Sequence, residues 1–221
     1  MERESNSKAL KYSKGTKPGG TTSAILGACP KGTDVLDVGC ASGYLGEELH
    51  NFGCRVWGVD SDKLALGNIP RGAYEETLDL DLNLPTDSGP FYPRLFDVVI
   101  AADVLEHVLD PERVLRTLSK SLKLNGLIIL SLPNVANVSI RIPLLFGRFD
   151  YTELGILDRT HLHLFTYKSA AQLVRDSGLE IELTLAGSDR FGRLLNKSPI
   201  VCKKLGPLFA FNIIYVCRPK N

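Results

Sequence analysis

A carboxylate and two glycines stand near the start of the chain at a spacing that suits ligand binding. Asp37 lies at the end of a short apolar run, and Gly39 and Gly43 follow it. Glycine lets the backbone approach a ligand closely, and the N–H groups at a helix start are free to bind one. Asp37 would repel a pyrophosphate, so we expect a ligand that carries a cation or hydrogen-bond donors. The glycine spacing also differs from that of phosphate and dinucleotide loops, which disfavours a nicotinamide dehydrogenase.

A second group of reactive residues follows the apolar run at 95–102. If the chain begins a helical turn there, Asp103, Glu106 and His107 share one face. His107 would then act as a general base or position the substrate, with Glu106 as an orienting partner. Two other interpretations stay open: a divalent cation bound by all three with His161 as a fourth ligand, or a purely structural turn. We predict His107 and His161 as the catalytic residues and expect no metal.

Short apolar runs alternate with helical patterns along most of the chain, which is typical of a doubly wound α/β protein. We expect a Rossmann-like seven-stranded sheet, mostly parallel, with the last strand antiparallel. The predicted strands cover residues 35–38, 54–59, 74–78, 95–102, 127–132, 179–185 and 208–217. The predicted helices include residues 21–28, 63–67, 111–122 and 167–177. Residues 187–207 are expected to form a basic connection.

The segment D-V-G-C-A-S-G, which begins at Asp37, resembles the first motif of class I S-adenosylmethionine-dependent methyltransferases, D-x-G-x-G-x-G. Ala41 replaces the middle glycine of that motif. The segments V-L-E-H and L-D-R-T-H-L-H-L-F-T are similar to segments of bacterial-type methyltransferases, and the resemblance extends over residues 20–186. It implies S-adenosylmethionine as the cofactor and a methyltransferase fold.

The expected cofactor contacts lie where the predicted strands end. An acidic residue after the second strand of a doubly wound fold binds ribose hydroxyls, and Asp60 has that place. The resemblance implies that Asp79 binds the adenine amino group and that Leu80 flanks the ring, although Asp81 replaces Asp79 if the register shifts. The full set of predicted cofactor residues is Asp37, Gly39, Cys40, Ala41, Gly43, Asp60, Ser61, Asp79, Leu80, Ala102 and Asp103.

The domain organisation is expected to be simple. Residues 1–19 are polar and predict a flexible N-terminal arm, and residues 20–221 predict a single methyltransferase domain. The stretch 135–165 is too long for an ordinary connection, so we interpret it as a lid over the substrate. In that lid, Arg159 and His161 either face the substrate or, in the structural alternative, Asp158 and Arg159 form an internal ion pair.

Composition narrows the function further. The 221 residues are 44% hydrophobic and 23% charged, with a net charge of +1, so no nucleic-acid partner is expected. The five cysteines form no C-x-x-C pair, which favours reduced thiols and a cytoplasmic protein. No apolar run approaches eighteen residues, so no membrane span is expected. Nothing in the composition predicts an oligomeric state.

These observations predict an S-adenosylmethionine-dependent methyltransferase that acts on an oxygen, nitrogen or carbon of a small-molecule or saccharide acceptor. The resemblance near Leu157 to Thr166 places a saccharide or small-molecule hydroxyl first and a quinone-like ring second. The alternative is a methyltransferase-like protein that binds the cofactor for regulatory or structural reasons, without turnover.

Overall fold

One seven-stranded sheet forms the centre of the protein, as the computed structural model shows for residues 20–187 and 192–220. The strands are β1 (Asp34–Val38), β2 (Arg55–Asp60), β3 (Glu76–Asp79), β4 (Phe96–Ala102), β5 (Leu122–Pro133), β6 (Leu179–Gly187) and β7 (Asn212–Pro219). Their order is β3-β2-β1-β4-β5-β7-β6, and β1 to β5 pair in parallel. β7 is antiparallel to both of its neighbours, which confirms the predicted fold class. The predicted arm, residues 1–19, lies outside the described residues.

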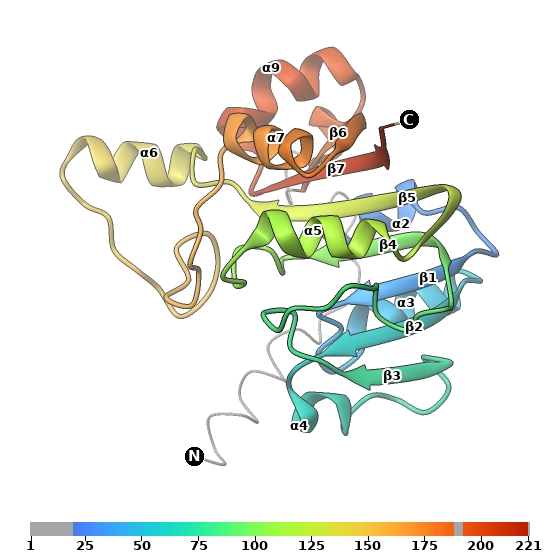
Figure 1. Ribbon diagram of the computed structural model, residues 1–221. Coiled ribbons are helices and arrows are strands. Elements are labelled where there is room, and N and C mark those ends of the chain that lie inside the picture. The colour runs from blue at the N-terminus through green and yellow to red at the C-terminus, as the bar shows by residue number, and fades with distance from the viewer. Residues whose placement is uncertain (1–19, 188–191, 221) are drawn as a thin grey trace.

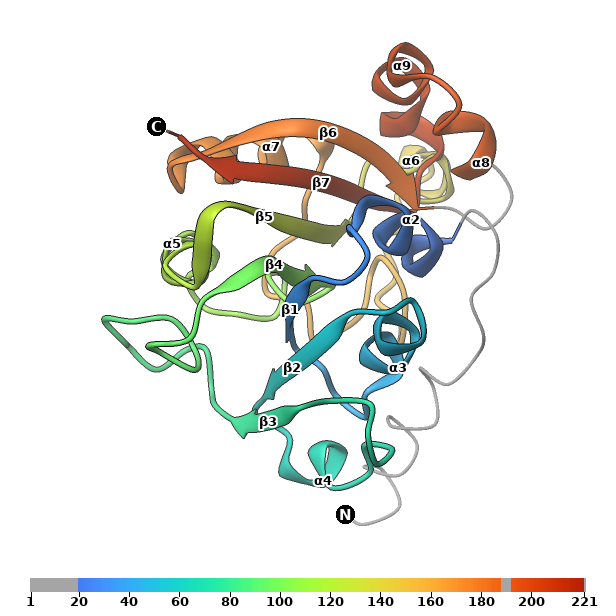
Figure 2. The same ribbon diagram turned by 90° about the vertical axis from the view of Figure 1, so that its right-hand side faces the viewer.

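Helices cover both faces of the sheet (Figures 1 and 2). α5 (Pro111–Ser119) and α7 (Tyr167–Asp176) pack on one face, in the core that contains Leu36 of β1. α2 (Thr21–Ala28) and α3 (Tyr44–Asn51) pack on the other, in the core that contains Val35. Successive strand residues point to opposite faces, so an apolar run in β1 supplies both cores. The short helix α4 (Lys63–Leu66) lies beside β3.

The end of α5 differs from the prediction. The helix begins at Pro111 with Asp110 as its cap, because the Asp110 carboxylate accepts a hydrogen bond from Arg113 N at 2.9 Å. It ends at Ser119 rather than at Leu122, which already belongs to β5 and pairs with Phe96. Leu118 and Leu122 are buried in the same core and are four residues apart, which is the spacing of a helical pattern. This spacing extended the predicted helix to Leu122, although the observed helix ends at Ser119.

The expected basic connection at 187–207 is also different. It contains α8 (Gly192–Leu195) and α9 (Pro199–Phe209), and β7 begins at Asn212 rather than at Leu208. Leu195 and Cys202 are buried against Ala186 at the end of β6, while the basic side chains of α9 lie on its exposed side. A helix can bury one face and expose charges on the other. The basic residues of this segment are therefore compatible with a helix and did not by themselves indicate a loop.

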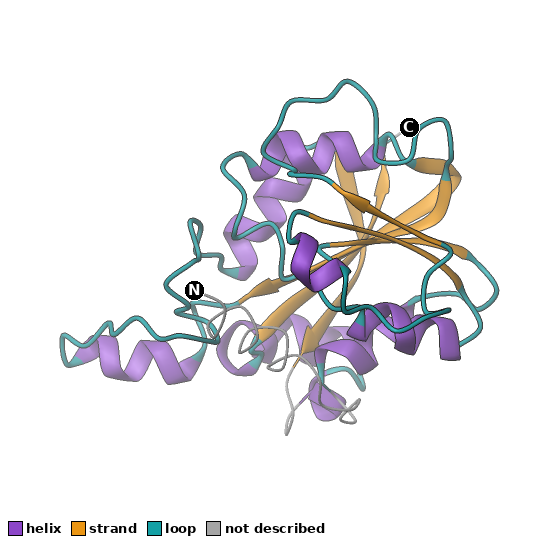
Figure 3. Ribbon diagram, turned by 90° about the horizontal axis from the view of Figure 1, so that it is seen from below, coloured by secondary structure: helices purple, strands orange, loops and turns teal. Residues whose placement is uncertain are grey.

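The predicted lid segment, 135–165, begins with α6 (Val138–Leu145), which extends away from the sheet (Figures 1 and 3). None of the residues of α6 is buried. Its start is fixed to the C-terminal region, since the Asn134 and Asn137 side chains both donate to Ala210 O at 2.9 Å. No helix among the described residues has the length and apolar character required to cross a bilayer.

The order of the strands creates a crevice at one edge of the sheet. From β1 the chain proceeds outward to β2 and β3, and it then returns to β4 and proceeds to β5 in the other direction. The loops after β1 and β4 therefore diverge, and open α/β sheets bind ligands at the carboxyl ends of strands at such a point. Gly39 follows β1 and Asp103 follows β4.

Candidate active site

Two cavities meet at this crevice, and both are lined by Gly39 and Asp103. The first, of about 390 Å³, lies between the ends of β2, β3 and β4 and the segment 153–160. The second, of about 250 Å³, lies between the loop after β1 and α2. Polar side chains of α2 and α3, namely Thr21, Thr22 and Tyr44, contribute to its lining. Together the cavities offer a continuous binding surface along the carboxyl edge of the sheet.

The loop after β1 has the left-handed conformations that its glycines predict. The φ angles of Gly39, Ala41 and Gly43 are +73°, +44° and +86°. A Cβ atom on Gly39 would lie 2.5 Å from Val104 Cγ2, so a side chain there would collide with the turn after β4. The strain of the left-handed Ala41 is opposed by a bond from its N–H to Asp60 Oδ2 at 2.8 Å.

The predicted cofactor residues are only partly brought together. Cys40, Ala41, Ala102 and Asp37 line the second cavity, and Asp60, Ser61 and Leu80 line the first. Gly43 and Asp79 line neither cavity. Gly43 caps α3 beside Ile69 and Tyr74, and Asp79 forms an ion pair with Lys63 at 2.9 Å. Asp81, the alternative to Asp79, lies on the first cavity.

Asp60 has more than one function in this geometry. Besides the bond from Ala41, its Oδ1 accepts a hydrogen bond from Asp62 N at 2.8 Å. Asp62 in turn caps α4, as its position predicts, by accepting bonds from Leu64 N and Ala65 N. A carboxylate oxygen can accept two bonds, so Asp60 joins two loops and still has acceptor capacity toward the cavity.

Asp37 is a buried acid at the end of β1, with 1% of its surface exposed. Its Oδ2 accepts a hydrogen bond of 2.6 Å from the Tyr74 hydroxyl. Burial raises the pKa of Asp37 to about 7, and the bond from Tyr74 opposes that rise. A cation bound in the second cavity would favour the ionised form of this carboxyl group.

The reactive turn after β4 is not a helix. Asp103 has a φ of +56°, and the turn closes with a bond from His107 N to Val104 O at 3.0 Å. Asp103 faces Ser131 and Asn212, whose side chains donate to its Oδ1 at 2.8 and 2.6 Å. The predicted grouping of Asp103 with Glu106 and His107 on one helical face is therefore wrong.

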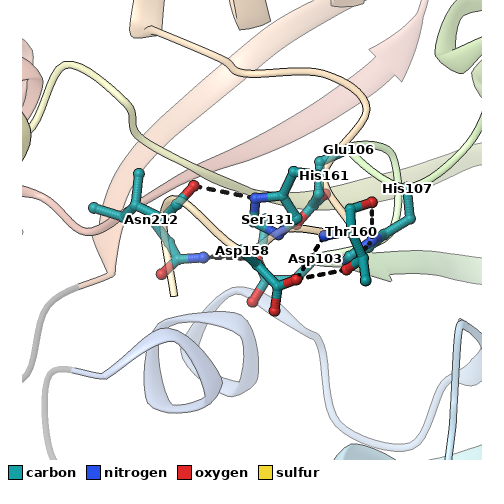
Figure 4. Close-up of polar contacts among 9 residues, drawn as sticks. Asp103, Glu106, His107, Ser131, Asp158, Thr160, His161 and Asn212 are labelled. Carbon is teal, nitrogen blue, oxygen red and sulfur yellow. Dashed lines mark hydrogen bonds and ion pairs between the residues drawn. The ribbon is translucent and has the colours of Figure 1, made fainter. Parts of the chain in front are cut away.

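Glu106 and His107 instead meet His161 from the lid segment (Figure 4). One ligand atom from each of these three side chains lies within 4.8 Å of the others, and the two imidazole centroids are 4.8 Å apart. The main chain holds this arrangement, since Glu106 O accepts bonds from Leu162 N at 2.8 Å and His163 N at 3.2 Å. We call Glu106, His107 and His161 the histidine cluster.

Both imidazoles of the cluster are oriented by carbonyl groups. His107 Nδ1 lies 3.2 Å from Thr160 O, and His161 Nδ1 lies 3.1 Å from Ile156 O. A carbonyl oxygen only accepts, so each Nδ1 is the donor in these contacts, and the neutral form of His107 then has its lone pair on Nε2. Partial loss of hydration lowers the pKa of His107 below its usual value, which favours the neutral ring. Only His107 of the cluster lines the first cavity.

Glu106 lies behind the two rings and is fully buried. Neither carboxyl oxygen has a hydrogen-bond partner among the described residues, and its Oε1 is 4.0 Å from His161 Nε2. Burial, and then the charge of Asp103, raise the pKa of Glu106 well above its usual value, which favours the neutral acid.

For Arg159 of the segment 135–165, the structure shows neither of the two expected placements. Arg159 pairs with Glu153 at 3.3 Å, and its side chain is 66% exposed. Asp158 accepts bonds from the N–H and hydroxyl of Thr160 instead, at 2.8 and 2.7 Å. The proposed Asp158–Arg159 ion pair is therefore absent from the lid segment as described, and Arg159 lines neither cavity.

Sequence reasoning missed several residues of the site. Tyr74 and Thr21 approach it from segments outside the motifs, whereas Thr160 lies within a motif and Tyr44 directly follows one without having been assigned a role. Tyr74 in particular follows a turn and precedes β3, where its aromatic ring fits an ordinary strand. Only the tertiary fold places its hydroxyl beside Asp37.

Comparisons with known proteins agree with this geometry. The model of a family described as a methyltransferase domain matches residues 16–184. The ubiquinone biosynthesis O-methyltransferase of Thiobacillus denitrificans is 33% identical over 156 residues, which cover 68% of this chain and 66% of that protein. The mitochondrial ubiquinone biosynthesis O-methyltransferase of Schizosaccharomyces pombe is 35% identical over 109 residues, or 47% of this chain and 39% of its own. The chain thus spans less than two thirds of these relatives.

Solved structures share the fold at lower identity. A TehB-like S-adenosylmethionine-dependent methyltransferase from Corynebacterium glutamicum is 15% identical, with a TM-score of 0.64 and complete coverage of both chains. Magnesium protoporphyrin IX methyltransferase from Synechocystis, solved with bound S-adenosylhomocysteine, is 18% identical with a TM-score of 0.59, covering 90% of this chain and 82% of its own.

Proposed function

The chain belongs to the class I S-adenosylmethionine-dependent methyltransferase family, and from this premise we propose that it methylates a hydroxyl oxygen of a small molecule. One observation carries the proposal: the two cavities meet at Gly39 and Asp103. The cofactor would extend across both, with its ribose at Asp60 and its amino acid part at Asp37. The part of the first cavity beside His107 and Leu154 is then left for the acceptor.

The chemistry of the cavity walls fits this cofactor. S-adenosylmethionine carries an ammonium and a sulfonium group, and the acids Asp37 and Asp60 face the two cavities. In the loop after β1, Gly39, Ala41 and Gly43 are left-handed, and Gly39 lines both cavities without a side chain that would fill the space. These features complement a cation with hydrogen-bond donors better than they complement a pyrophosphate.

When bound, the cofactor supplies an activated methyl group, whose bond to sulfur breaks as the bond to the acceptor oxygen forms. His107 is the group we assign to the hydroxyl proton. Its lowered pKa favours the neutral ring, which has a lone pair on Nε2, and it lines the acceptor part of the first cavity. His161 and Glu106 lie behind His107, so we assign them to holding its position rather than to contact with the acceptor.

We place a phenolic hydroxyl before a saccharide as the acceptor. The relatives named above support an oxygen acceptor on a small molecule. A neutral imidazole also removes a phenolic proton, with a pKa of about 10, more readily than that of a sugar alcohol. A screen of phenols, catechols and saccharides with methyl-labelled cofactor tests this order. Faster labelling of saccharides would reverse it.

The non-catalytic alternative, cofactor binding without turnover, has a distinct outcome in the same screen. If calorimetry shows that S-adenosylmethionine binds but no acceptor is labelled in any class, the regulatory alternative replaces methyl transfer. If the cofactor itself fails to bind while NAD binds, the cofactor assignment is wrong.

A divalent cation at the histidine cluster is the second candidate, because three ligand atoms converge there. A cation that activates the acceptor oxygen must reach the first cavity, and only His107 does so. We therefore expect a chelator to leave turnover unchanged. Loss of activity on chelation, with recovery on adding a divalent ion and with intact cofactor binding, would favour the metal.

Substitution of His107 gives the complementary prediction. His107→Ala should lower turnover roughly 100-fold or more, because no base then takes the proton from the hydroxyl of the substrate. Since the pKa of His107 is lowered, the wild-type rate should fall only as pH drops below about 6.5, and this acidic limb should vanish in the variant. The pH dependence of kcat measures both effects. Unchanged turnover would leave His107 without a catalytic role.

A further inference from the structure

The side chain of Tyr74 occupies a space created by two glycines beneath the loop after β1. A Cβ atom on Gly46 of α3 would lie 1.9 Å from Tyr74 Cζ, and one on Gly58 of β2 would lie 2.8 Å from its Cε1. The main chain beside Tyr74 is fixed as well, since Glu75 N donates to Val56 O at 2.8 Å. The ring therefore has little freedom to move away from β1.

The hydroxyl group of Tyr74 has a defined direction. Gly46 N donates to this oxygen at 3.1 Å, so the oxygen is an acceptor on the side of α3. Its own hydrogen is then left for Asp37 Oδ2, at an oxygen-to-oxygen distance of 2.6 Å. Hydrogen bonds to charged acceptors are shorter and stronger than neutral ones, and this bond holds one oxygen of Asp37 in place.

We propose that Tyr74 is a positioning residue for the cofactor, whose hydroxyl orients Asp37 and keeps it anionic toward the cationic amino group bound in the second cavity. This inference rests on the proposed function only for the identity of the cofactor. Asp37 lines the second cavity, whereas Tyr74 lines neither cavity, so Tyr74 acts through Asp37.

The charged surroundings of Asp37 explain why it needs such a partner. Burial favours the neutral acid, and Asp60 on the neighbouring strand β2 disfavours a second negative charge. The thiol of Cys40 faces the same group and is kept neutral by burial and by the two acids, its pKa being raised. Tyr74 is the group that opposes these effects with a hydrogen bond to the charged form.

Removal of the hydroxyl should therefore have a pH signature. Without the hydrogen bond from Tyr74, the pKa of Asp37 rises further, and more of the protein has a protonated Asp37 at pH 7. Asp37 must then lose this proton when S-adenosylmethionine binds, which lowers the net binding free energy. Tyr74→Phe should raise the Kd for S-adenosylmethionine roughly tenfold or more at pH 7. At pH 9 the loss should be smaller, because Asp37 is then ionised before the ligand binds.

The experiment compares wild type, Tyr74→Phe and Tyr215→Phe by calorimetry between pH 6 and pH 9. Tyr215 is the matched control, a buried tyrosine whose hydroxyl donates to Tyr167 O at 2.9 Å and which lines neither cavity. Each protein is titrated with S-adenosylmethionine and with methylthioadenosine, which lacks the amino acid part. We expect Tyr74→Phe to weaken only S-adenosylmethionine and Tyr215→Phe to change neither.

Different outcomes separate the possible failures. Equal weakening of both ligands by Tyr74→Phe would mean a merely structural tyrosine, and unchanged affinity would remove any role; both overturn the inference. A wild type that binds neither ligand refutes the proposed function instead. Asp37→Asn supplies an independent check: in that background, adding Tyr74→Phe should cause no further loss, whereas additive losses would contradict action through Asp37.

Discussion

Three buried or partly buried acids of the site differ in chemistry because their immediate partners differ. Asp37 has a tyrosine hydroxyl, Asp60 has two backbone N–H groups, and Glu106 has no hydrogen-bond partner among the described residues. The pKa of Asp37 is therefore raised to about 7, Asp60 connects two loops, and the raised pKa of Glu106 favours its neutral acid. From the sequence, all three are carboxylates near a strand end, and only their neighbours distinguish them.

Replacement of Asp60 should weaken the cofactor more than a matched change nearby. Asp60→Ala removes the predicted ribose acceptor and the anchor of the strained Ala41, so the cofactor should lose on the order of 1 to 3 kcal/mol of binding free energy. Asp62→Ala removes only the cap of α4 and should lower stability by about 1 kcal/mol with unchanged affinity. Calorimetry and urea unfolding separate the two effects. If Asp60→Ala and Asp62→Ala bind the cofactor with equal affinity, Asp60 is not the residue that binds the ribose.

Glu106 should make the protein less stable as the pH rises. Its pKa is raised in the folded state, so unfolding releases a proton above the ordinary pKa of about 4.5, and the free energy of unfolding falls with increasing pH in that range. Glu106→Gln cannot titrate, and its stability relative to wild type should increase from pH 5 to pH 8. Urea unfolding measures this difference, with Glu112→Gln on the exposed side of α5 as the control. Parallel pH dependences of wild type and Glu106→Gln would show that Glu106 is already ionised.

The spacing of apolar residues predicted where helices and strands lie better than it predicted where they end. The predicted bounds of α2 and the predicted starts of α5 and α7 are confirmed, and in the structure Asp110 and Thr166 cap α5 and α7. The apolar pattern gave a wrong end for α5, because Leu122 of β5 is buried in the same core as the residues of the helix. It also missed α9, where charged residues occupy the exposed face of the helix. Such boundaries depend on packing between distant segments, which local patterns do not contain.

Arg113 of α5 illustrates a contact between elements that bears on binding. Its guanidinium donates to the carbonyls of Leu82 at 2.7 Å, Asn83 at 3.1 Å and Leu84 at 3.3 Å. Residues 80–83 of that loop line the first cavity. Arg113→Ala should therefore release the loop and raise the cofactor Kd by roughly tenfold.

The neighbouring Arg116 is a suitable control for this prediction. It is exposed, lies on the same helix and pairs with Glu112, so Arg116→Ala should leave the cofactor Kd unchanged. Calorimetry on both variants distinguishes a loop-specific effect from a general effect of losing a cation on α5. A similar loss in both would refute the assignment to the loop.

The position of a site residue relative to the sheet decides whether the sequence could predict it. The glycine loop and the turn after β4 follow strands, Asp60 is the last residue of β2, and parallel strands bring their carboxyl ends to one edge. The segment 135–165 and Tyr74 reach that edge through contacts between residues far apart in the chain, such as Glu106 O with Leu162 N. The mostly parallel sheet could be inferred from the alternation of strands and helices. The sequence offered His161 beside His107 only as one alternative, because thirty residues without a sheet position can fold back in many ways.

The last prediction concerns the stability of the whole chain with its ligand. The cavities include residues from α2, β1, β2 and β4 and the segment 153–160, so a bound cofactor would connect elements on both sides of the crevice. A ligand that binds only the folded state stabilises it by about 2.7 kcal/mol at one hundred times its Kd. For a chain of this size the melting temperature should rise by roughly 5 to 10 °C with S-adenosylmethionine or S-adenosylhomocysteine. NAD should cause no shift, because its pyrophosphate would lie beside Asp37 and Asp60. Thermal unfolding followed by circular dichroism measures this, and an equal shift with NAD would contradict the cofactor assignment.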